Sequence, residues 1–429
     1  MKKTFIMKKT LYATAAILIG TMLTVSCGKE DTGSGPVGPE EMEELDPNPF
    51  TPIILTYAEW QVASSANTFA FDAYRALYQD EQMLFSPLSL SLALSMTACG
   101  ADGRTAEQMV HALGFDEYST EDVASYYSKM VEGLRTVDNK TTFESANSVW
   151  IDKKLQVKES FLATAEEHFS VETQNVSFSD PSTLDAINRW CSDNTHGKIG
   201  KMLDSISPNC VMALINAIYF NGKWAFDFKD KTSKENFRTI AGENVKLDMM
   251  SVSHNMSYSE VDGWSMVQIP YGNGAFSMSV ILPPEKTSFR EAVEAFTSDM
   301  WSNLYQSGGS ANVNLRMPEF KFEYNVDGLV KVLTDLGMSD AFTGAADFSK
   351  MAEITDGDAL YIGDIKQKTF IEVNRKGTEA AATTVVEMFD SSVRPPEPKK
   401  VDFIVDRPFF FLIREKSSNS ILFIGQKVN

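Results

Sequence analysis

The side chains that most often carry out chemistry are few and scattered in this chain. The four histidines, His111, His168, His196 and His254, have no second His or Cys at the spacing of metal ligands. The sequence also contains no Gly-x-Ser-x-Gly elbow, no His-Glu-x-x-His motif and no Gly-x-x-x-x-Gly-Lys-Ser/Thr loop. The 58 acidic residues leave a carboxylate pair open, but the pattern singles none out. We therefore expect no enzyme, no metal site and no cofactor.

One segment near the C-terminus combines the pattern of a strand with that of an exposed loop. Residues 369–373 read as a strand, and Gly377 can absorb a change of backbone direction. From Thr378 to Met388, alternate positions on one face are small near the glycine and larger beyond it. The stretch 390–398, rich in Ser and Pro, is typical of a solvent loop. The segment therefore suits a switching element, and an edge strand followed by a loop is the alternative interpretation.

The elements that must position this segment are mixed. Helices are predicted over 62–77, between Ser86-Pro87 and Gly100, and between Asp180-Pro181 and Gly197. Strands are predicted at 276–282, 313–317, 401–405, 409–413 and 421–424. The last three are continuous apolar runs, so we expect both of their faces to be covered. Helices lead and strands finish, which predicts an α+β fold class in one domain over residues 51–429.

Composition and charge narrow the function further. The chain has 429 residues, 43% of them hydrophobic, which suffices for a large core. Its net charge of −19 argues against nucleic acid or an anionic membrane as a partner. Cys99, Cys191 and Cys210 lie in apolar or helical contexts, so we expect buried thiols rather than disulfides.

The first 50 residues are predicted to be an export signal followed by a linker. Four lysines precede the apolar stretch 11–25, which is too short for a comfortable transmembrane helix, so residues 1–26 read as a signal peptide. Thr24-Val25-Ser26-Cys27 resembles a bacterial lipobox, which predicts lipidation of Cys27, although Thr24 replaces the usual Leu. Secretion without lipid is the alternative. Residues 27–50 are predicted to form a flexible acidic Gly/Pro linker. Signal removal takes the net charge from −19 to −23, because it removes four lysines and no acids.

Several short segments together resemble the serpin family of protease inhibitors, over about residues 57–429. They are, in family order, Phe85-Ser86-Pro87-Leu88-Ser89, Asn194-Thr195-His196-Gly197-Lys198-Ile199, Asn216-Ala217-Ile218-Tyr219-Phe220-Asn221-Gly222-Lys223-Trp224, Gly377-Thr378-Glu379-Ala380-Ala381-Ala382-Thr383 and Asp406-Arg407-Pro408-Phe409-Phe410-Phe411. The resemblance implies a serpin fold: a large central mixed sheet, smaller sheets, surrounding helices and an exposed reactive-centre loop at about 375–400.

The resemblance also implies a mechanism and roles for individual residues. A protease would cut the loop and become acylated, and the loop would then insert into the central sheet and trap it. Gly377 to Thr383 match the family's hinge, Ser86, Ser89 and Asn216 match its shutter, and Trp224 matches its breach tryptophan. Two departures stand out. Gln367 replaces the shutter His of many members, and Arg375 replaces a usual Glu before the hinge.

The family's usual count of fourteen residues from Gly377 predicts Ser391-Ser392 as the reactive bond. Phe389, Asp390 and Val393 are alternative reactive-bond residues. Small and apolar residues near the cut imply elastase-, chymotrypsin-, subtilisin- or papain-like proteases as partners. A non-inhibitory serpin, acting as a substrate, binding or carrier protein, is the alternative function. We expect a monomer that is exported, contacts membrane only through lipid on Cys27, and lies in the outer membrane facing the surface or the periplasm.

Overall fold

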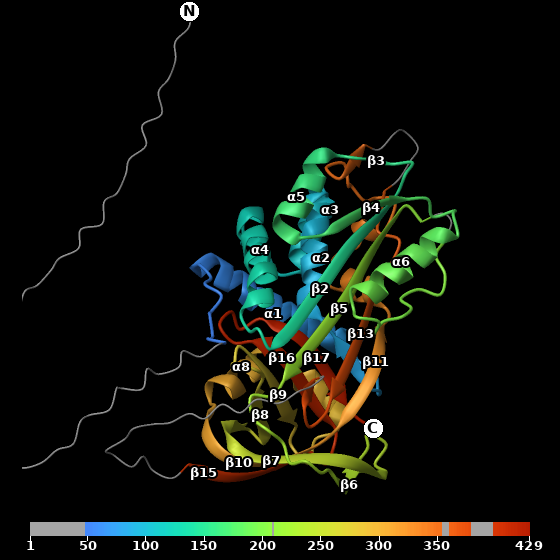
Figure 1. Cartoon of the computed structure of the whole chain (residues 1–429). Coiled ribbons are helices and arrows are strands. Elements are labelled where there is room, and N and C mark those ends of the chain that lie inside the picture. Colours follow the sequence, from blue (N-terminus) through green and yellow to red (C-terminus); the bar gives the residue numbers. More distant parts are fainter. Residues whose placement is uncertain (1–47, 208–209, 354–359, 379–397) are drawn as a thin grey trace, which may run out of the picture. The chain divides into compact units, whose positions relative to one another are not determined.

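A computed structural model describes residues 48–207, 210–353, 360–378 and 398–429 (Figure 1). Within these ranges the helices are α1 (Tyr57–Leu77), α2 (Pro87–Cys99), α3 (Gly103–Ala112), α4 (Thr120–Thr136), α5 (Glu159–Phe169), α6 (Ser182–Asp193), α7 (Phe289–Ala295), α8 (Ser298–Gln306) and α9 (Leu329–Asp335). The strands are β1 (Met83–Phe85), β2 (Thr141–Asp152), β3 (Gln156–Val157), β4 (Glu172–Val176), β5 (Met212–Lys223), β6 (Ser233–Arg238), β7 (Asn244–Val261), β8 (Trp264–Pro270), β9 (Phe276–Leu282), β10 (Gly309–Pro318), β11 (Phe320–Val326), β12 (Ala352–Glu353), β13 (Ile365–Val373), β14 (Gly377–Thr378), β15 (Lys399–Ile404), β16 (Phe409–Glu415) and β17 (Ile421–Lys427). The predicted α+β class is confirmed.

The long central sheet has the order β11-β13-β5-β2-β4, with β14 added to β5. β2 and β5 pair antiparallel along nearly their whole length, whereas β13 runs parallel to β5. Buried and partly exposed side chains alternate along β13, which contains the strand predicted at 369–373. Figure 1 shows these strands side by side through the centre of the domain.

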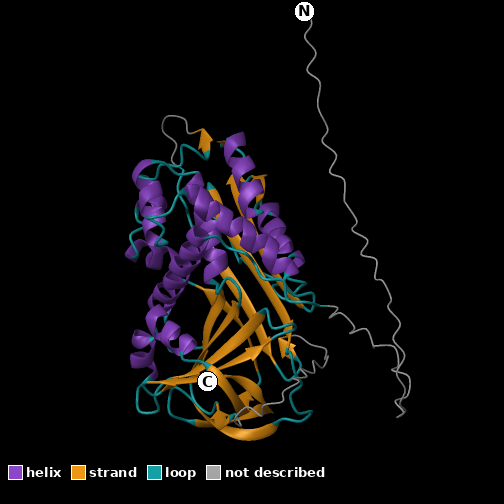
Figure 2. Ribbon diagram, turned by 90° about the vertical axis from the view of Figure 1, so that its left-hand side faces the viewer, coloured by secondary structure: helices purple, strands orange, loops and turns teal. Residues whose placement is uncertain are grey.

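A second sheet contains most of the C-terminal half of the chain. Its order is β1-β17-β16-β9-β8-β7-β10-β15, and β6 pairs with β7. Every residue of β16 and β17 is buried, which confirms that these two apolar runs are covered on both faces. The same expectation was wrong for β15, where Asp402 is exposed and Val401 and Ile404 are only partly buried, because β15 is at the edge of the sheet. Figure 2 shows most helices gathered over the upper part of the long sheet and the second sheet below it.

Helix α2 lies in the core and contacts both sheets. Eleven of its thirteen residues are buried, and it begins with Pro87 directly after Ser86, as predicted. The Ser86 hydroxyl, however, makes no cap to the helix and instead donates to the carbonyl of Leu422 at 2.7 Å. Ser86 therefore ties the helix start to β17.

Helix α6 covers part of the opposite side of the sheet with a smaller core. Ile187 and Cys191 are fully buried against Trp150 of β2 and Ile215 of β5. The helix begins at Ser182, one residue later than Asp180-Pro181 predicted, and the Asp180 carboxylate accepts from the Ser182 amide at 2.9 Å. Cys99, Cys191 and Cys210 are free thiols, as expected, although Cys99 and Cys210 are only partly buried.

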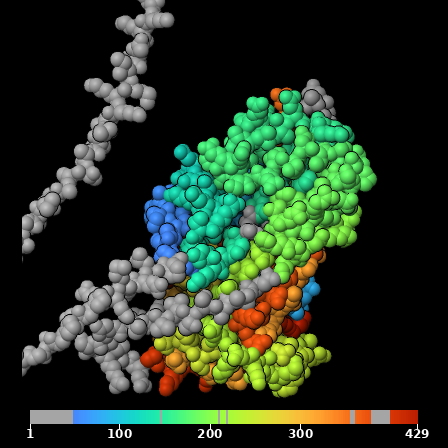
Figure 3. Space-filling view, viewed as in Figure 1, coloured from blue at the N-terminus to red at the C-terminus, as the bar shows by residue number. Residues whose placement is uncertain are grey.

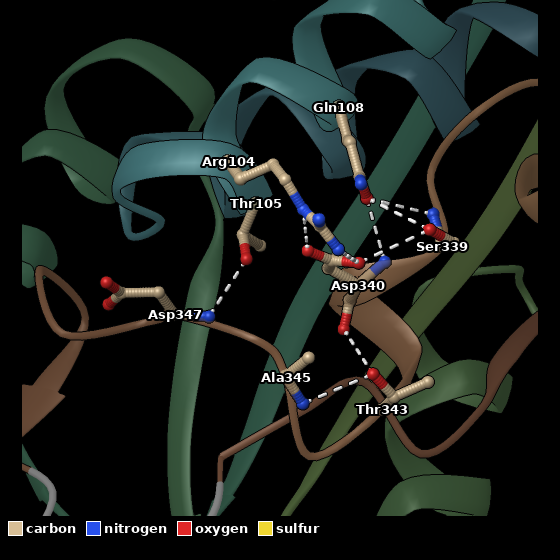
Figure 4. A network of polar contacts seen from close by, with 8 residues as sticks. All are labelled: Arg104, Thr105, Gln108, Ser339, Asp340, Thr343, Ala345 and Asp347. Atoms are coloured by element: carbon tan, nitrogen blue, oxygen red, sulfur yellow. Dashed lines mark hydrogen bonds and ion pairs between the residues drawn. The ribbon is translucent and has the colours of Figure 1, made fainter.

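The segment that leads into β13 is held to helix α3 by polar contacts (Figure 4). Arg104 donates from Nε and Nη2 to the Asp340 carboxylate at 2.5 and 2.6 Å. The side-chain oxygen of Gln108 accepts from the amides of Ser339 and Asp340. The same segment continues into β12, which pairs with β3. The contacts of α3 therefore fix the chain around Asp340, ahead of β12.

Residues 48–56, which we call the strap, lie along helix α4. The buried side chain of Asn48 donates to Asp138 at 2.6 Å and accepts from the Asn139 amide at 2.9 Å. The amide of Ile53 donates to the Ser417 hydroxyl at 2.9 Å. Residues 48–50, predicted as the end of the linker, are therefore in contact with the body.

Candidate functional site

The strand β14 lies at the edge of β5 that faces β13. β2 occupies one edge of β5 up to Gly222, so β13 and β14 must share the other edge. β13 pairs with Leu214 to Ala217, and β14 pairs with Gly222 and Lys223. The chain reverses between them in a tight turn in which Asn374 and Gly377 form an antiparallel bridge. β5 and β13 therefore pair with each other at one end, whereas at the other end β5 pairs with β14, at the start of the predicted loop.

Gly377 is required at this position by both space and backbone geometry. Its φ angle is +128°, in the region that side chains with a Cβ disfavour. A Cβ at residue 377 would lie 2.3 Å from the Gly222 carbonyl oxygen and 2.7 Å from the Lys223 Cα. Only glycine therefore lets β14 approach β5 closely enough to pair.

Trp224 supports the turn before β14. Its indole Nε1 donates to the carbonyl of Asn374 at 2.9 Å. Its ring is buried and stacks on Tyr271, with centroids 4.4 Å apart and planes 13° apart. Because both the ring and its donor are engaged, Trp224 links the turn to Tyr271, directly after β8, and to the core. Tyr271 is a member of this site that the sequence patterns did not indicate.

Arg375, noted in the sequence as a departure, forms an ion pair at the same turn. Its Nε donates to the Glu319 carboxylate at 3.0 Å, and its backbone amide donates to the same oxygen at 3.1 Å. Its Nη1 also donates to the carbonyl of Asp230. Glu319 lies between β10 and β11, so the ion pair ties the turn to the neighbouring strand pair.

Lower in the sheet, a buried polar cluster joins helix α2 to β13 and β5. The side-chain oxygen of Gln367 accepts from the Ser86 amide at 2.9 Å, and its nitrogen donates to the Ser86 carbonyl at 3.0 Å. The same nitrogen donates to Asn216 Oδ1 at 3.2 Å. The neutral Gln367 amide thus makes three bonds at the position where the resemblance implied His.

The cluster continues on the other side of β5. Asn216 donates to both Ser89 of α2 and Asn147 of β2. Asn147 was not indicated by the sequence analysis. It could have been found in the sequence because it lies two positions before the apolar Val149, so the two side chains point to the same face of the strand, and both are buried. Ser86, Ser89 and Asn216 therefore lie together, while Trp224 and Gly377 lie together at the separate turn site.

Part of the predicted site falls outside the described residues. Gly377 and Thr378 are described, whereas Glu379, Ala380, Ala381, Ala382 and Thr383 are not. The same holds for the reactive-bond candidates Phe389, Asp390, Ser391, Ser392 and Val393, and for Cys27. Among the residues that are described, no group of three or more His, Cys, Asp or Glu could hold a metal ion, and no helix is long and apolar enough to cross a bilayer.

Comparisons with known proteins show the family and the fold. A family model described as Serpin (serine protease inhibitor) matches residues 64–429. An uncharacterized serpin-like protein of Methanosarcina acetivorans is 32% identical over 96% of this chain and 95% of its own length. The native-state crystal structure of the thermophilic serpin tengpin has a TM-score of 0.78 and 31% identity, covering 89% of this chain and 97% of tengpin. Human thyroxine-binding globulin has a TM-score of 0.77 at 27% identity, covering 87% and 99%.

Proposed function

Because this chain belongs to the serpin family, we propose that it inhibits serine endopeptidases as a suicide substrate. Serpins in general are protease inhibitors rather than enzymes, and the proposal adds the mechanism and the residues. The reactive-centre loop, about residues 375–400, is offered to the protease as a substrate. Papain-like cysteine proteases are a second target class.

The observation that carries the proposal is the position of β14. Gly377 and Thr378, near the start of the loop, already pair with β5 on the edge that faces β13. Four residues of β5 lie between this pairing and the β13 pairing at Ala217. Extending β14 past Thr378 would add rungs between the same two strands. After cleavage, the loop can therefore insert by extending the existing strand β14, and no new strand has to be nucleated.

Capture of the protease is one acyl transfer. The protease nucleophile attacks the carbonyl carbon of Ser391, and the peptide bond to Ser392 breaks. Ser392 leaves with a proton as a new amino terminus, and the protease remains bonded as an acyl-enzyme. Insertion of the loop then carries the protease away from the site of attack, and distortion of its active site stops hydrolysis of the ester.

The driving force for insertion is large enough to distort a bound protease. Residues 378–388 would span roughly 36 Å as a strand, at about 3.3 Å per residue. About ten new ladder bonds at roughly 0.5–1.5 kcal/mol each provide on the order of 10 kcal/mol. Burial of Val386 and Met388 would add about 3–5 kcal/mol. These values are comparable to the whole folding free energy of an ordinary domain, about 5–15 kcal/mol.

Incubation with elastase-, chymotrypsin-, subtilisin- and papain-like proteases tests the proposal. We expect a covalent band that survives denaturation, and mass spectrometry of the released C-terminal peptide should locate the bond at Ser391-Ser392. Ala380→Arg places a charge on the face that must be buried, so it should yield cleaved chain without complex. Ala381→Arg, on the opposite face of the strand pattern, is the matched control and should retain the complex. Equal complex formation by both variants would contradict insertion.

A non-inhibitory role is the second candidate function. It is favoured by the similarity to human thyroxine-binding globulin, whose structure was solved with its ligand. In that case the chain would act as a substrate, binding or carrier protein, and every protease would release cleaved chain with no covalent band. The small side chains of Ala380 and Ala382 favour inhibition, because bulky or charged side chains on this face of the strand pattern would oppose insertion.

We also propose an exported, lipid-anchored monomer. Cys27 would carry the lipid after removal of residues 1–26, and residues 27–50 would include the linker to the body. The anchor would lie in the outer membrane, facing the surface or the periplasm. Mass spectrometry of the mature N-terminus tests this part independently of inhibition, since a lipid-free N-terminus other than Cys27 would reject it.

A further inference from the structure

Exposed large apolar side chains are concentrated at the start of the described body. Among the described residues five are exposed, and four of them are Phe50, Ile54, Tyr57 and Trp60. Ile54 is 72% exposed, Tyr57 82% and Trp60 47%. Tyr57 and Trp60 are one turn apart on α1, so they share a helix face. We call Ile54, Tyr57 and Trp60 the apolar patch.

The backbone that carries the apolar patch is fixed to the body by several contacts. Ile53, next to Ile54, is buried against helix α4. It packs so closely on Gly133 that a Cβ at residue 133 would lie 2.6 Å from Ile53 Cγ1. The Ile54 carbonyl accepts from Lys129 at 3.3 Å. Between Tyr57 and Trp60, Glu59 completes a capping box with Thr56. Figure 3 shows this N-terminal part of the body, in blue, at the surface beside α4, in teal. The exposed side chains therefore project from a fixed support.

The chain outside the described residues argues for one occupant of the patch. Residues 28–47 contain only Val37, Met42 and Leu45 as apolar side chains among seven acids, so they offer little to cover it. Twenty residues separate Cys27 from Asn48, a reach of at most roughly 70 Å. A lipid on Cys27 would keep Asn48, where the described body begins a few residues before the patch, within that distance of a membrane. Trp and Tyr beside an aliphatic residue are the types that favour a bilayer interface.

We propose that the apolar patch docks the body on the interface of a lipid bilayer, an inference that rests on the proposed lipidation of Cys27 for its proximity to membrane. Contact comes from insertion of apolar side chains rather than from charge. The net charge of −23 expected after signal removal opposes an anionic surface, and Lys129, which donates to the Ile54 carbonyl, is paired with Glu59 at 2.7 Å. Docking should therefore favour zwitterionic lipid and depend little on salt.

The test uses the mature chain, residues 27–429, coupled through Cys27 to a maleimide lipid in phosphatidylcholine vesicles, so that the tether length is natural. Burial raises the pKa of Cys99 to about 11 and of Cys191 to about 12 and also raises that of Cys210, so these thiols react slowly at neutral pH. Brominated phosphatidylcholine then quenches tryptophans that reach the interface. The tethered wild-type chain should lose a fluorescence component that Trp60→Phe lacks. Absence of a Trp60-dependent component would overturn the proposal.

A second measurement identifies the contact without the tether. Untethered Cys27→Ser chain is floated with the same vesicles, and Ile54→Ser with Tyr57→Ser should lower the partition coefficient about tenfold or more. Tyr361→Ser, which alters the fifth exposed large side chain, is the matched control and should change nothing. Equal partitioning of both variants would overturn the proposal, as would a dimer through the patch, seen by sedimentation and lost in the double variant. Covalent protease complexes should form equally in all these variants, so failure of the inhibitory proposal is distinguishable.

Discussion

The side-chain amide of Gln367 pairs with both polar groups of the Ser86 backbone, accepting from the amide at 2.9 Å and donating to the carbonyl at 3.0 Å. Both residues are buried, and no charge is involved. The contact joins the start of α2 to β13. A neutral amide here does not titrate between pH 4 and 9, unlike the histidine that the resemblance had implied.

Replacing Gln367 with Met should weaken this part of the sheet. The volume is nearly kept, but the buried Ser86 amide loses its acceptor, at a cost of about 1–3 kcal/mol. We expect a lower thermal midpoint and faster loss of inhibitory activity on incubation. Lys366→Met, on the neighbouring and partly exposed position of β13, is the control. Identical midpoints for the two variants would show that the amide bonds contribute nothing.

The Arg375–Glu319 pair should behave as one unit. Arg375→Glu places two carboxylates together, and it should destabilise the turn before β14 by about 1–2 kcal/mol, since the pair is only partly exposed. The double variant Arg375→Glu with Glu319→Arg should recover part of this loss. The stoichiometry of inhibition and the thermal midpoint give the coupling energy of the cycle. Additive effects of the two single substitutions would mean that the ion pair is incidental.

Gly377→Ala should displace β14 from β5. The new Cβ meets the Gly222 carbonyl and the Lys223 backbone, neither of which can move without disturbing β5. We expect more cleaved chain per trapped protease, together with a shift in the Trp224 fluorescence, because Trp224 is bonded to the same turn. Gly309→Ala, where a Cβ meets nothing within 4 Å, is the control. A normal stoichiometry in Gly377→Ala would remove β14 from the mechanism.

Glu59 should contribute an acid-sensitive part of the stability. Burial raises its pKa, but the hydrogen bonds from Lys129, Ser125 and Thr56 outweigh burial and lower the pKa to about 2. Because the folded pKa lies below the unfolded one, this stability is present above about pH 4.5 and is lost as the pH falls toward 2. The linkage amounts to at most about 3 kcal/mol.

Thermal midpoints measured from pH 7 to pH 2 test this linkage. The difference between wild type and Glu59→Gln should be largest at neutral pH and should shrink between pH 4.5 and 2. Glu132→Gln, at an exposed position of α4, is the control. A difference that stays constant across the range would mean that Glu59 acts through packing alone.

Local patterns were enough to predict some of the elements, because each of these depends on a few neighbouring residues. Pro87 after Ser86 marked the start of α2, and alternation marked β9 and β10. Where a side chain had a choice of partners, the local pattern misjudged it. Ser86 looked like a helix cap, but its hydroxyl bonds to Leu422, 336 residues away in sequence.

By itself, the sequence determined the α+β class, several of the helices and strands, and the resemblance that assigned family roles to Ser86, Asn216 and Gly377. Only the tertiary structure decided that Asn147 completes the cluster around Asn216, that Glu319 is the partner of Arg375, and that β14 shares an edge of β5 with β13. The reason is physical. Spacing along the chain sets which face a side chain occupies, whereas its bonding partner depends on strand order and register, which are fixed only when distant segments pack together.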